Sequence, residues 1–115
     1  MKFIMVAVCC MVLGLLASGC ARGISQDNGR AQCLTWSPSP STDDGGYFCL
    51  ESNEICAANF PGQVLESLDR AQCEQHCAQV KRDQRRQHPV DGCEALINKA
   101  WDLCRTYCSS KPATQ

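Results

Sequence analysis

The chain has 115 residues, eleven of which are cysteine, and its formal net charge is −1. This length holds at most one small domain, and a near-neutral charge excludes a broadly basic protein that binds nucleic acid through its overall charge. A small domain with this many cysteines is typical of secreted proteins whose disulfide bonds offset a limited hydrophobic core.

The N-terminus is typical of a secretory signal peptide, residues 1–21. Lys2 is followed by an uncharged run that ends in small residues. The strongly apolar part of this run is shorter than the ~20 residues that a membrane-spanning helix needs, which favours a cleaved signal over an anchor. Cleavage after Ala21 would match an animal precursor. Cleavage after Gly19 would leave Cys20 at the new N-terminus, where the stretch Leu-Ala-Ser-Gly-Cys resembles the lipidation site of bacterial lipoproteins.

Two polar stretches flank the first cysteine after the signal. Residues 22–32 contain the turn-forming pair Asn28 and Gly29, and we expect a flexible arm or a short propeptide there. Residues 37–46 consist almost entirely of turn-forming residues, so they predict a surface loop. The folded domain is therefore expected to cover residues 33–115.

A strongly amphipathic helix is predicted over residues 91–108. Apolar residues and cysteines occupy one half of its helical wheel, and polar residues occupy the other half. Trp101 and Tyr107 fall on the apolar half and are expected in the core. Asp91 and Glu94 stand three residues apart at the start, where the two side chains can cap backbone N–H groups reciprocally. We therefore expect Asp91 to be the N-cap.

The composition of residues 63–86 is also helical, but the apolar residues do not form one stripe. Val64 and Leu68 lie on one side of the wheel, and Cys73 and Cys77 lie almost opposite. One interpretation is a single helix that is covered on both sides. We favour this interpretation because it gives the N-terminal cysteines a surface to be joined to.

The alternative for this stretch is a break near Ser67. Asp69 and Gln72 stand three residues apart after that point, and their side chains would then form a second reciprocal cap at the start of a new helix. The wheel alone leaves both interpretations open.

The cysteine spacing predicts how two helices are joined. Three of the eleven cysteines lie in the signal segment, so eight remain, and four disulfides are the default in an oxidising export route. Cysteines four residues apart lie on the same face of a helix. Two antiparallel helices that each carry such a pair can be joined at two levels, which predicts the disulfides Cys73–Cys108 and Cys77–Cys104.

The other four cysteines are Cys33, Cys49, Cys56 and Cys93. Cys93 lies about 16 Å from Cys104 along a straight helix axis, too far for a disulfide. It therefore pairs with one of the three N-terminal cysteines, and all three arrangements stay open. The predicted fold is mainly α, a small disulfide-rich domain built on an antiparallel helical hairpin with a stapled N-terminal loop region.

A zinc site is the alternative for the cysteines of the hairpin, with His76 nearby. The export signal favours oxidation to disulfides over zinc binding. The sequence contains no motif of a serine hydrolase, a zinc protease or a secreted phospholipase, and the cysteines are better explained as bridged than as nucleophilic. We therefore expect no enzyme activity, no catalytic residue, no cofactor and no metal.

A basic cluster at the expected hairpin tip is the candidate contact surface. It consists of Lys81, Arg82, Arg85 and Arg86. The simplest interpretation is a solvated tip, and the functional one is contact with an acidic surface such as a channel vestibule, a receptor or anionic lipid head groups. Trp36 lies beside the predicted loop and is expected to be an exposed aromatic contact.

The paired Cys-x3-Cys spacing at Cys73/Cys77 and Cys104/Cys108 is similar to that of small mitochondrial intermembrane-space chaperones and, more loosely, of plant and scorpion helical-hairpin peptides. Those chaperones lack a cleaved secretory signal. The combination of signal, short propeptide and one cysteine-dense helical domain looks like the precursors of animal venom toxins. This resemblance implies a secreted, extracellular toxin that binds and modulates an ion channel or receptor.

Two other functions stay open. One is a bacterial envelope lipoprotein that carries lipid on Cys20, and the other is a small lipid-binding or membrane-active secreted protein.

Overall fold

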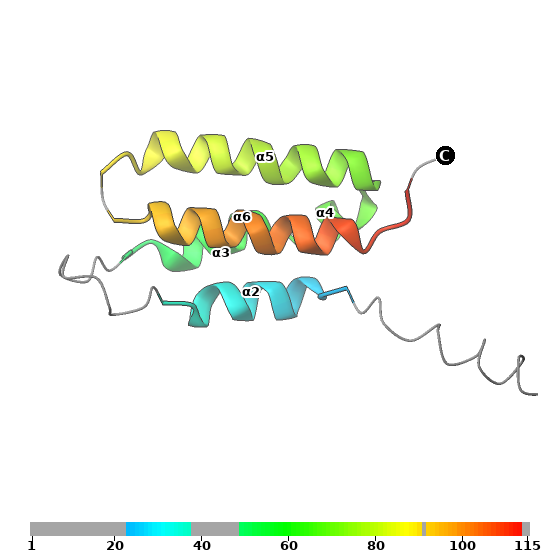
Figure 1. Cartoon of the computed structure of the whole chain (residues 1–115), viewed down its shortest axis with the longest axis horizontal. Coiled ribbons are helices and arrows are strands. Elements are labelled where there is room, and N and C mark those ends of the chain that lie inside the picture. The colour runs from blue at the N-terminus through cyan, green and yellow to red at the C-terminus, as the bar shows by residue number, and fades with distance from the viewer. Residues whose placement is uncertain (1–22, 38–48, 91, 114–115) are drawn as a thin grey trace, which may run out of the picture.

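The computed structural model describes residues 23–37, 49–90 and 92–113. This part of the chain is helical, contains no strand and carries four disulfides, so the predicted fold class is confirmed (Figure 1). None of its helices is long and apolar enough to cross a membrane. The signal segment with Cys20, most of the predicted loop, and Asp91 lie outside the described residues. The helices are α2 (Gln26–Thr35), α3 (Ser52–Asn59), α4 (Gln63–Ser67), α5 (Arg70–Gln87) and α6 (Glu94–Ser109).

Helices α5 and α6 form an antiparallel hairpin (Figure 1). The Cys73–Cys108 and Cys77–Cys104 disulfides join them at successive turns, with Cα–Cα distances of 5.6 and 5.8 Å. These are the two pairs that the four-residue spacing predicts. All four cysteines are fully buried, so the sulfur atoms form part of the interface between the two helices.

The chain breaks between α4 and α5, and the single helix favoured for residues 63–86 is wrong. Asp69 is the N-cap of α5, and its carboxylate accepts the backbone N–H of Gln72 at 2.8 Å. The Gln72 side chain in turn accepts the backbone N–H of Asp69 at 3.2 Å. This reciprocal cap satisfies donors that a new helix start exposes. Within α4, Leu65 is buried and Val64 is exposed.

The segment before Cys33 is a packed helix, so the flexible arm expected over residues 22–32 is wrong for the residues in α2. Ser25 caps α2, and its hydroxyl accepts the backbone N–H of Asn28 at 3.2 Å. The Gln26 amide donates to the Gly62 carbonyl at 2.8 Å and accepts the Gly62 N–H at 2.9 Å. Helix α2 is therefore part of the packed structure.

Gly29 lies inside α2, although the Asn28-Gly29 pair indicates a turn. A Cβ atom on Gly29 would lie 2.6 Å from both Cε1 and Cζ of Phe60. The missing side chain lets the buried Phe60 ring lie against the backbone of α2. At this position the glycine serves the close approach of two elements rather than a turn.

Helix α6 begins at Glu94, later than predicted. Its N-cap is Cys93, which provides no side-chain cap, so the expected reciprocal cap with Asp91 as N-cap is not how the helix starts. Cys93 is held instead by its disulfide to Cys49, with a Cα–Cα distance of 4.7 Å. A covalent bond therefore fixes the end of α6 that side-chain capping was expected to define.

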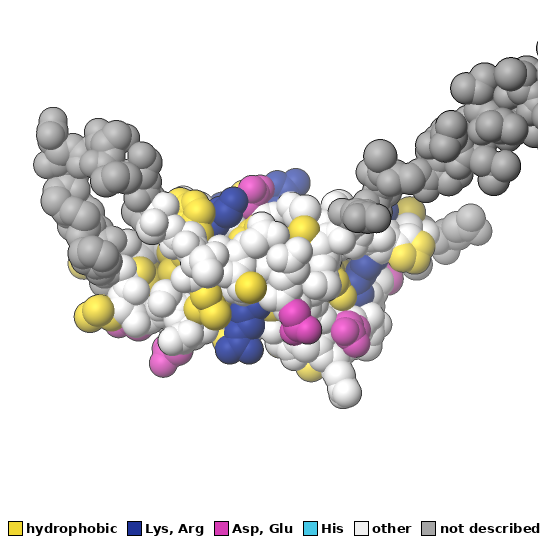
Figure 2. All heavy atoms as spheres, turned by 90° about the horizontal axis from the view of Figure 1, so that it is seen from below, with side chains coloured by type: hydrophobic (Ala, Val, Ile, Leu, Met, Phe, Trp, Pro, Cys, Tyr) yellow, Lys and Arg dark blue, Asp and Glu magenta, His cyan; other side chains and the backbone are white. Residues whose placement is uncertain are grey.

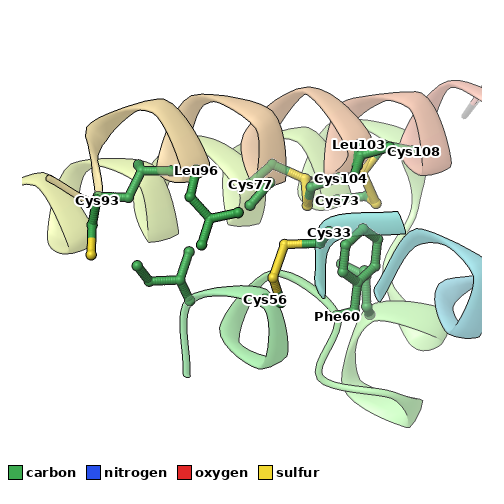
Figure 3. Packing of buried hydrophobic residues seen from close by; sticks show 14 residues of the cluster. Cys33, Cys56, Phe60, Cys73, Cys77, Cys93, Leu96, Leu103, Cys104 and Cys108 are labelled. Carbon is green, nitrogen blue, oxygen red and sulfur yellow. Dashed lines mark hydrogen bonds between the residues drawn. A yellow bond between two sulfur atoms is a disulfide. The ribbon is translucent and has the colours of Figure 1, made fainter. Parts of the chain in front are cut away.

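The remaining disulfide, Cys33–Cys56, joins α2 to α3. Together with Cys49–Cys93 it is one of the three arrangements that the spacing leaves open, and it links the N-terminal half to the hairpin. Helices α2, α3 and α5 all pack against α6, and Figure 3 shows the disulfides and apolar side chains between them. Besides the cysteines, the core consists of Ile55, Phe60, Leu65, Leu96, Ile97, Ala100 and Leu103.

Two buried amides connect α3 to α5. The Gln84 side chain donates to the Ile55 carbonyl at 3.0 Å, and the Asn59 side chain donates to the Gln84 side-chain oxygen at 3.3 Å. Both side chains are almost fully buried. Buried amides that bond each other favour one arrangement of their elements, because any shift leaves polar groups unpaired. They fix the half of α5 that carries the basic residues.

Candidate functional site

The basic cluster of α5 divides into two sides in the folded chain. Lys81 and Arg85 are one turn apart and face α6. The Lys81 ammonium lies 3.5 Å from the centroid of the Trp101 ring, and an Arg85 guanidinium nitrogen lies 3.2 Å from a Glu94 carboxylate oxygen. The four expected contact residues therefore do not all face α6.

The other two cations interact along α5 itself. Arg82 donates to the Gln79 side chain at 2.7 Å, and Arg86 lies 4.0 Å from the Asp83 carboxylate. Both arginines are exposed. Such contacts on a solvated helix surface contribute little to stability, so this side of α5 matches the simpler interpretation of a solvated tip.

Trp101 is the central residue on the side that carries Lys81 and Arg85. It is half-buried rather than fully in the core, and it packs against the core cluster. The Arg105 guanidinium carbon lies 4.7 Å from the ring centroid, so the indole contacts two cations, Lys81 and Arg105. A cation over an aromatic face gains about 0.5–1 kcal/mol at an exposed site. The indole therefore contacts both positive groups and favours these positions by a small free energy. We call Trp101 with Lys81, Arg85 and Arg105 the Trp101 surface.

Positive charge on the Trp101 surface exceeds the negative charge beside it. Arg85 pairs with Glu94 and also donates to the Asn98 side chain at 3.3 Å. Among the described residues, no carboxylate lies within ion-pair distance of Lys81 or Arg105. Burial, followed by the charges of Arg85 and Arg105, lowers the pKa of Lys81. The three cations repel one another, and one carboxylate compensates them only in part.

Sequence reasoning missed Arg105 and assigned Trp101 wholly to the core. The predicted disulfide register is enough to place both residues next to Lys81. If Cys77 faces Cys104, the residue one turn after Cys77 faces the residue one turn before Cys104. That places Lys81 opposite Trp101, and Arg105 lies one turn beyond Trp101 on the same helix face.

Trp36 does not belong to the Trp101 surface. It follows α2 directly as the C-cap residue, is half-buried and packs against the core cluster. Helices α2 and α5 both pack on α6 and lie on opposite sides of it in Figure 1. Trp36 and the basic residues of α5 therefore do not form one contact surface.

The sulfur atoms considered for zinc are bonded to one another in the structure. The two hairpin disulfides lie so close that Cys77 Sγ is 3.4 Å from Cys108 Sγ. Zinc binds thiolates, so these cysteines would have to be reduced before they could serve as ligands. His76 is half-buried, and its Nε2 atom lies 3.3 Å from the Ala58 carbonyl oxygen.

Exposed hydrophobic side chains lie beside the Cys49–Cys93 disulfide. Leu50 is 88% exposed and Val90 is 93% exposed. The disulfide holds the two segments that carry them together, at the end of the molecule where α5 turns into α6. Figure 2 shows hydrophobic side chains on the surface at this end. Val64, which is 60% exposed, lies on α4 and is remote from this end.

A comparison with protein-family models, curated proteins and solved structures found no match to this chain. No residue role is therefore transferred from another protein. The structure supports the coarser part of the expected resemblance, a small, helical, cysteine-rich domain with four disulfides. Multiple disulfides are typical of extracellular proteins.

Proposed function

We propose that this protein is a secreted, toxin-like ligand that binds an ion channel or receptor and modulates it. The observation that supports this proposal best is the covalent connection of the helices. Disulfides join α2 to α3, the segment before α3 to the start of α6, and α5 to α6 twice. Each disulfide typically stabilises a small domain by about 2–4 kcal/mol.

A surface fixed in this way loses little conformational entropy when it binds. The two hairpin disulfides set the register of α5 against α6, and this register determines where the cations of the Trp101 surface stand. An acidic receptor surface would attract the molecule and orient it. Modulation would follow from occlusion of a pore or from interference with gating by the bound, rigid molecule.

The test measures binding of the fluorescently labelled, oxidised mature protein to membranes prepared from excitable tissue. We expect saturable binding that trypsin treatment of the membranes removes. Reduced and alkylated protein is the matched control, because it keeps the sequence and loses the fixed surface. Binding that does not saturate, that survives trypsin, or that the alkylated protein retains would contradict the proposal.

A membrane-active protein is the second candidate, and the exposure of Leu50 and Val90 favours it. Apolar side chains that project beside a rigid disulfide can enter the boundary between lipid head groups and acyl chains. This function predicts leakage of a trapped dye from phosphatidylcholine/phosphatidylglycerol vesicles, and loss of leakage in the double variant Leu50→Asp/Val90→Asp. Val64→Asp is the control at the remote exposed valine, and equal loss in the control would reject this candidate.

A further inference from the structure

The Trp101 surface presents two cations that have no carboxylate of the described residues within ion-pair distance. The Lys81 ammonium and the Arg105 guanidinium both lie against the Trp101 ring, 3.5 and 4.7 Å from its centroid. Arg85 adds a third positive charge, which Glu94 partly offsets at 3.2 Å. Like charges held close together raise the energy of the free protein, and an anion that binds beside them lowers it.

The donors at this surface match a carboxylate. An ammonium has three N–H donors and a guanidinium has five in a planar fork, and hydrogen bonds between such groups and a carboxylate are stronger than those between neutral groups. Lys81 is half-buried, so its interactions are less screened by water than those of the exposed arginines. The Trp101 indole, which both cations contact, supplies an apolar plane for the carbon atoms of an acidic side chain.

Glu94, beside the Trp101 surface, favours a ligand of moderate charge density. Glu94 is exposed and lies beside Arg85, and its carboxylate would repel a dense polyanion such as a sulfated polysaccharide. An acidic protein segment can place carboxylates at Lys81 and Arg105 and keep its other charges away from Glu94.

We propose that the Trp101 surface is the docking site of this protein, and that its partner is an acidic protein segment whose carboxylates pair with Lys81 and Arg105. This inference rests on the proposed function, because it names the part of the molecule that contacts the receptor and the chemistry it recognises. It replaces the expected contact set, since Arg82, Arg86 and Trp36 take no part.

The test uses a hexaglutamate peptide as the probe and the oxidised mature protein, followed by ¹H–¹⁵N NMR. We expect the indole N–H resonance of Trp101 to shift and to saturate, while that of Trp36 stays in place and serves as the internal reference. The double variant Lys81→Gln/Arg105→Gln should lower the affinity about tenfold or more, because it removes two charge-assisted contacts. The double variant Arg82→Gln/Arg86→Gln removes the same charge from the other side of α5, and its affinity should change less than about twofold.

Three results would overturn the inference. They are the absence of a saturable shift at Trp101, an equal loss of affinity in both double variants, and tighter binding of a heparin hexasaccharide than of hexaglutamate. Lys81→Arg keeps the charge and the ring contact, so it should bind like the parent and shows whether loss of binding reflects loss of fold. The two experiments separate failure of the site from failure of the proposed function. Hexaglutamate binding without membrane binding rejects the receptor and keeps the site, whereas membrane binding without hexaglutamate binding rejects the site alone.

Discussion

Substitution of Gly29 by alanine should destabilise the protein, although the same change inside an ordinary helix is stabilising. Alanine in place of an interior helical glycine gains about 1 kcal/mol. Here the new methyl group would lie 2.6 Å from Cε1 and Cζ of Phe60, whereas carbon atoms in contact are about 3.5–4.0 Å apart. Either the ring or α2 must therefore move by about 1 Å.

The ring has little room to move, because Phe60 is 5% exposed and belongs to the core cluster. Ile24 also lies 3.3 Å from the position of the new methyl group. Extra volume in a packed core costs about 1–3 kcal/mol. After the helix-propensity gain is subtracted, we expect Gly29→Ala to lower the free energy of unfolding by about 1 kcal/mol.

Guanidinium chloride unfolding with the disulfides intact measures this change. Ala31→Gly, on the exposed side of the same helix, is the control that reports helix propensity alone. In a Phe60→Leu background the smaller side chain should make Gly29→Ala neutral or stabilising, which gives a coupling energy between the two positions. A gain of about 1 kcal/mol from Gly29→Ala in the parent protein would refute the close approach of α2 to Phe60.

Three further predictions concern single residues. Asp69→Ala removes the carboxylate that accepts the backbone N–H of Gln72 and should lower the free energy of unfolding in guanidinium chloride by about 1 kcal/mol. Asp69→Asn should lower it much less, and equal effects of the two substitutions would contradict the cap. Lys111→Met removes an ammonium that donates to the Leu65 carbonyl at 2.7 Å. It should lower the free energy of unfolding by about 1 kcal/mol in the same assay, and an unchanged denaturation midpoint would contradict a stabilising role of this hydrogen bond. Lys81 should titrate below 10.5 because of burial and the neighbouring arginines, so the folded state loses this proton first and stability should rise with pH between the lowered pKa and 10.5. NMR of the Lys81 side-chain nitrogen checks this direction, and a pKa at or above 10.5 would contradict it.

The hairpin could be predicted because its information is local. A pair of cysteines four residues apart marks one helix face, and two such pairs specify both the antiparallel arrangement and the register. The same spacing says nothing about Cys33 and Cys56, which lie on the short helices α2 and α3, or about Cys49, which precedes α3. Their pairing depends on how the N-terminal half folds over α6.

The sequence did not predict the break before α5 or helix α2 correctly. The first has competing local patterns, and the second depends on a contact that is distant in the chain. The break before α5 has a local signal in Asp69 and Gln72, but apolar residues on both sides of the wheel favour one long helix that is covered on both sides. Helix α2 is held by Gln26, whose amide bonds Gly62 across 36 positions of the chain. No local sequence pattern predicts such a contact, and the Asn28-Gly29 pair predicts a turn instead.

The candidate site could be predicted only in part. The charges of α5 were evident from composition, but their division into two sides required the position of α6. Trp101 falls on the apolar half of its helical wheel, which predicts burial, yet it stands at the edge of the hairpin interface where Lys81 and Arg105 reach its ring. A wheel shows the face of one helix and does not show which residues of the neighbouring helix border it.

The central claim is that four specific disulfides hold the helices in one arrangement. Tandem mass spectrometry of peptides from the non-reduced, secreted protein tests it most directly. The account predicts the linked pairs Cys33–Cys56, Cys49–Cys93, Cys73–Cys108 and Cys77–Cys104. Free thiols, bound zinc or any other pairing among these eight cysteines would contradict it.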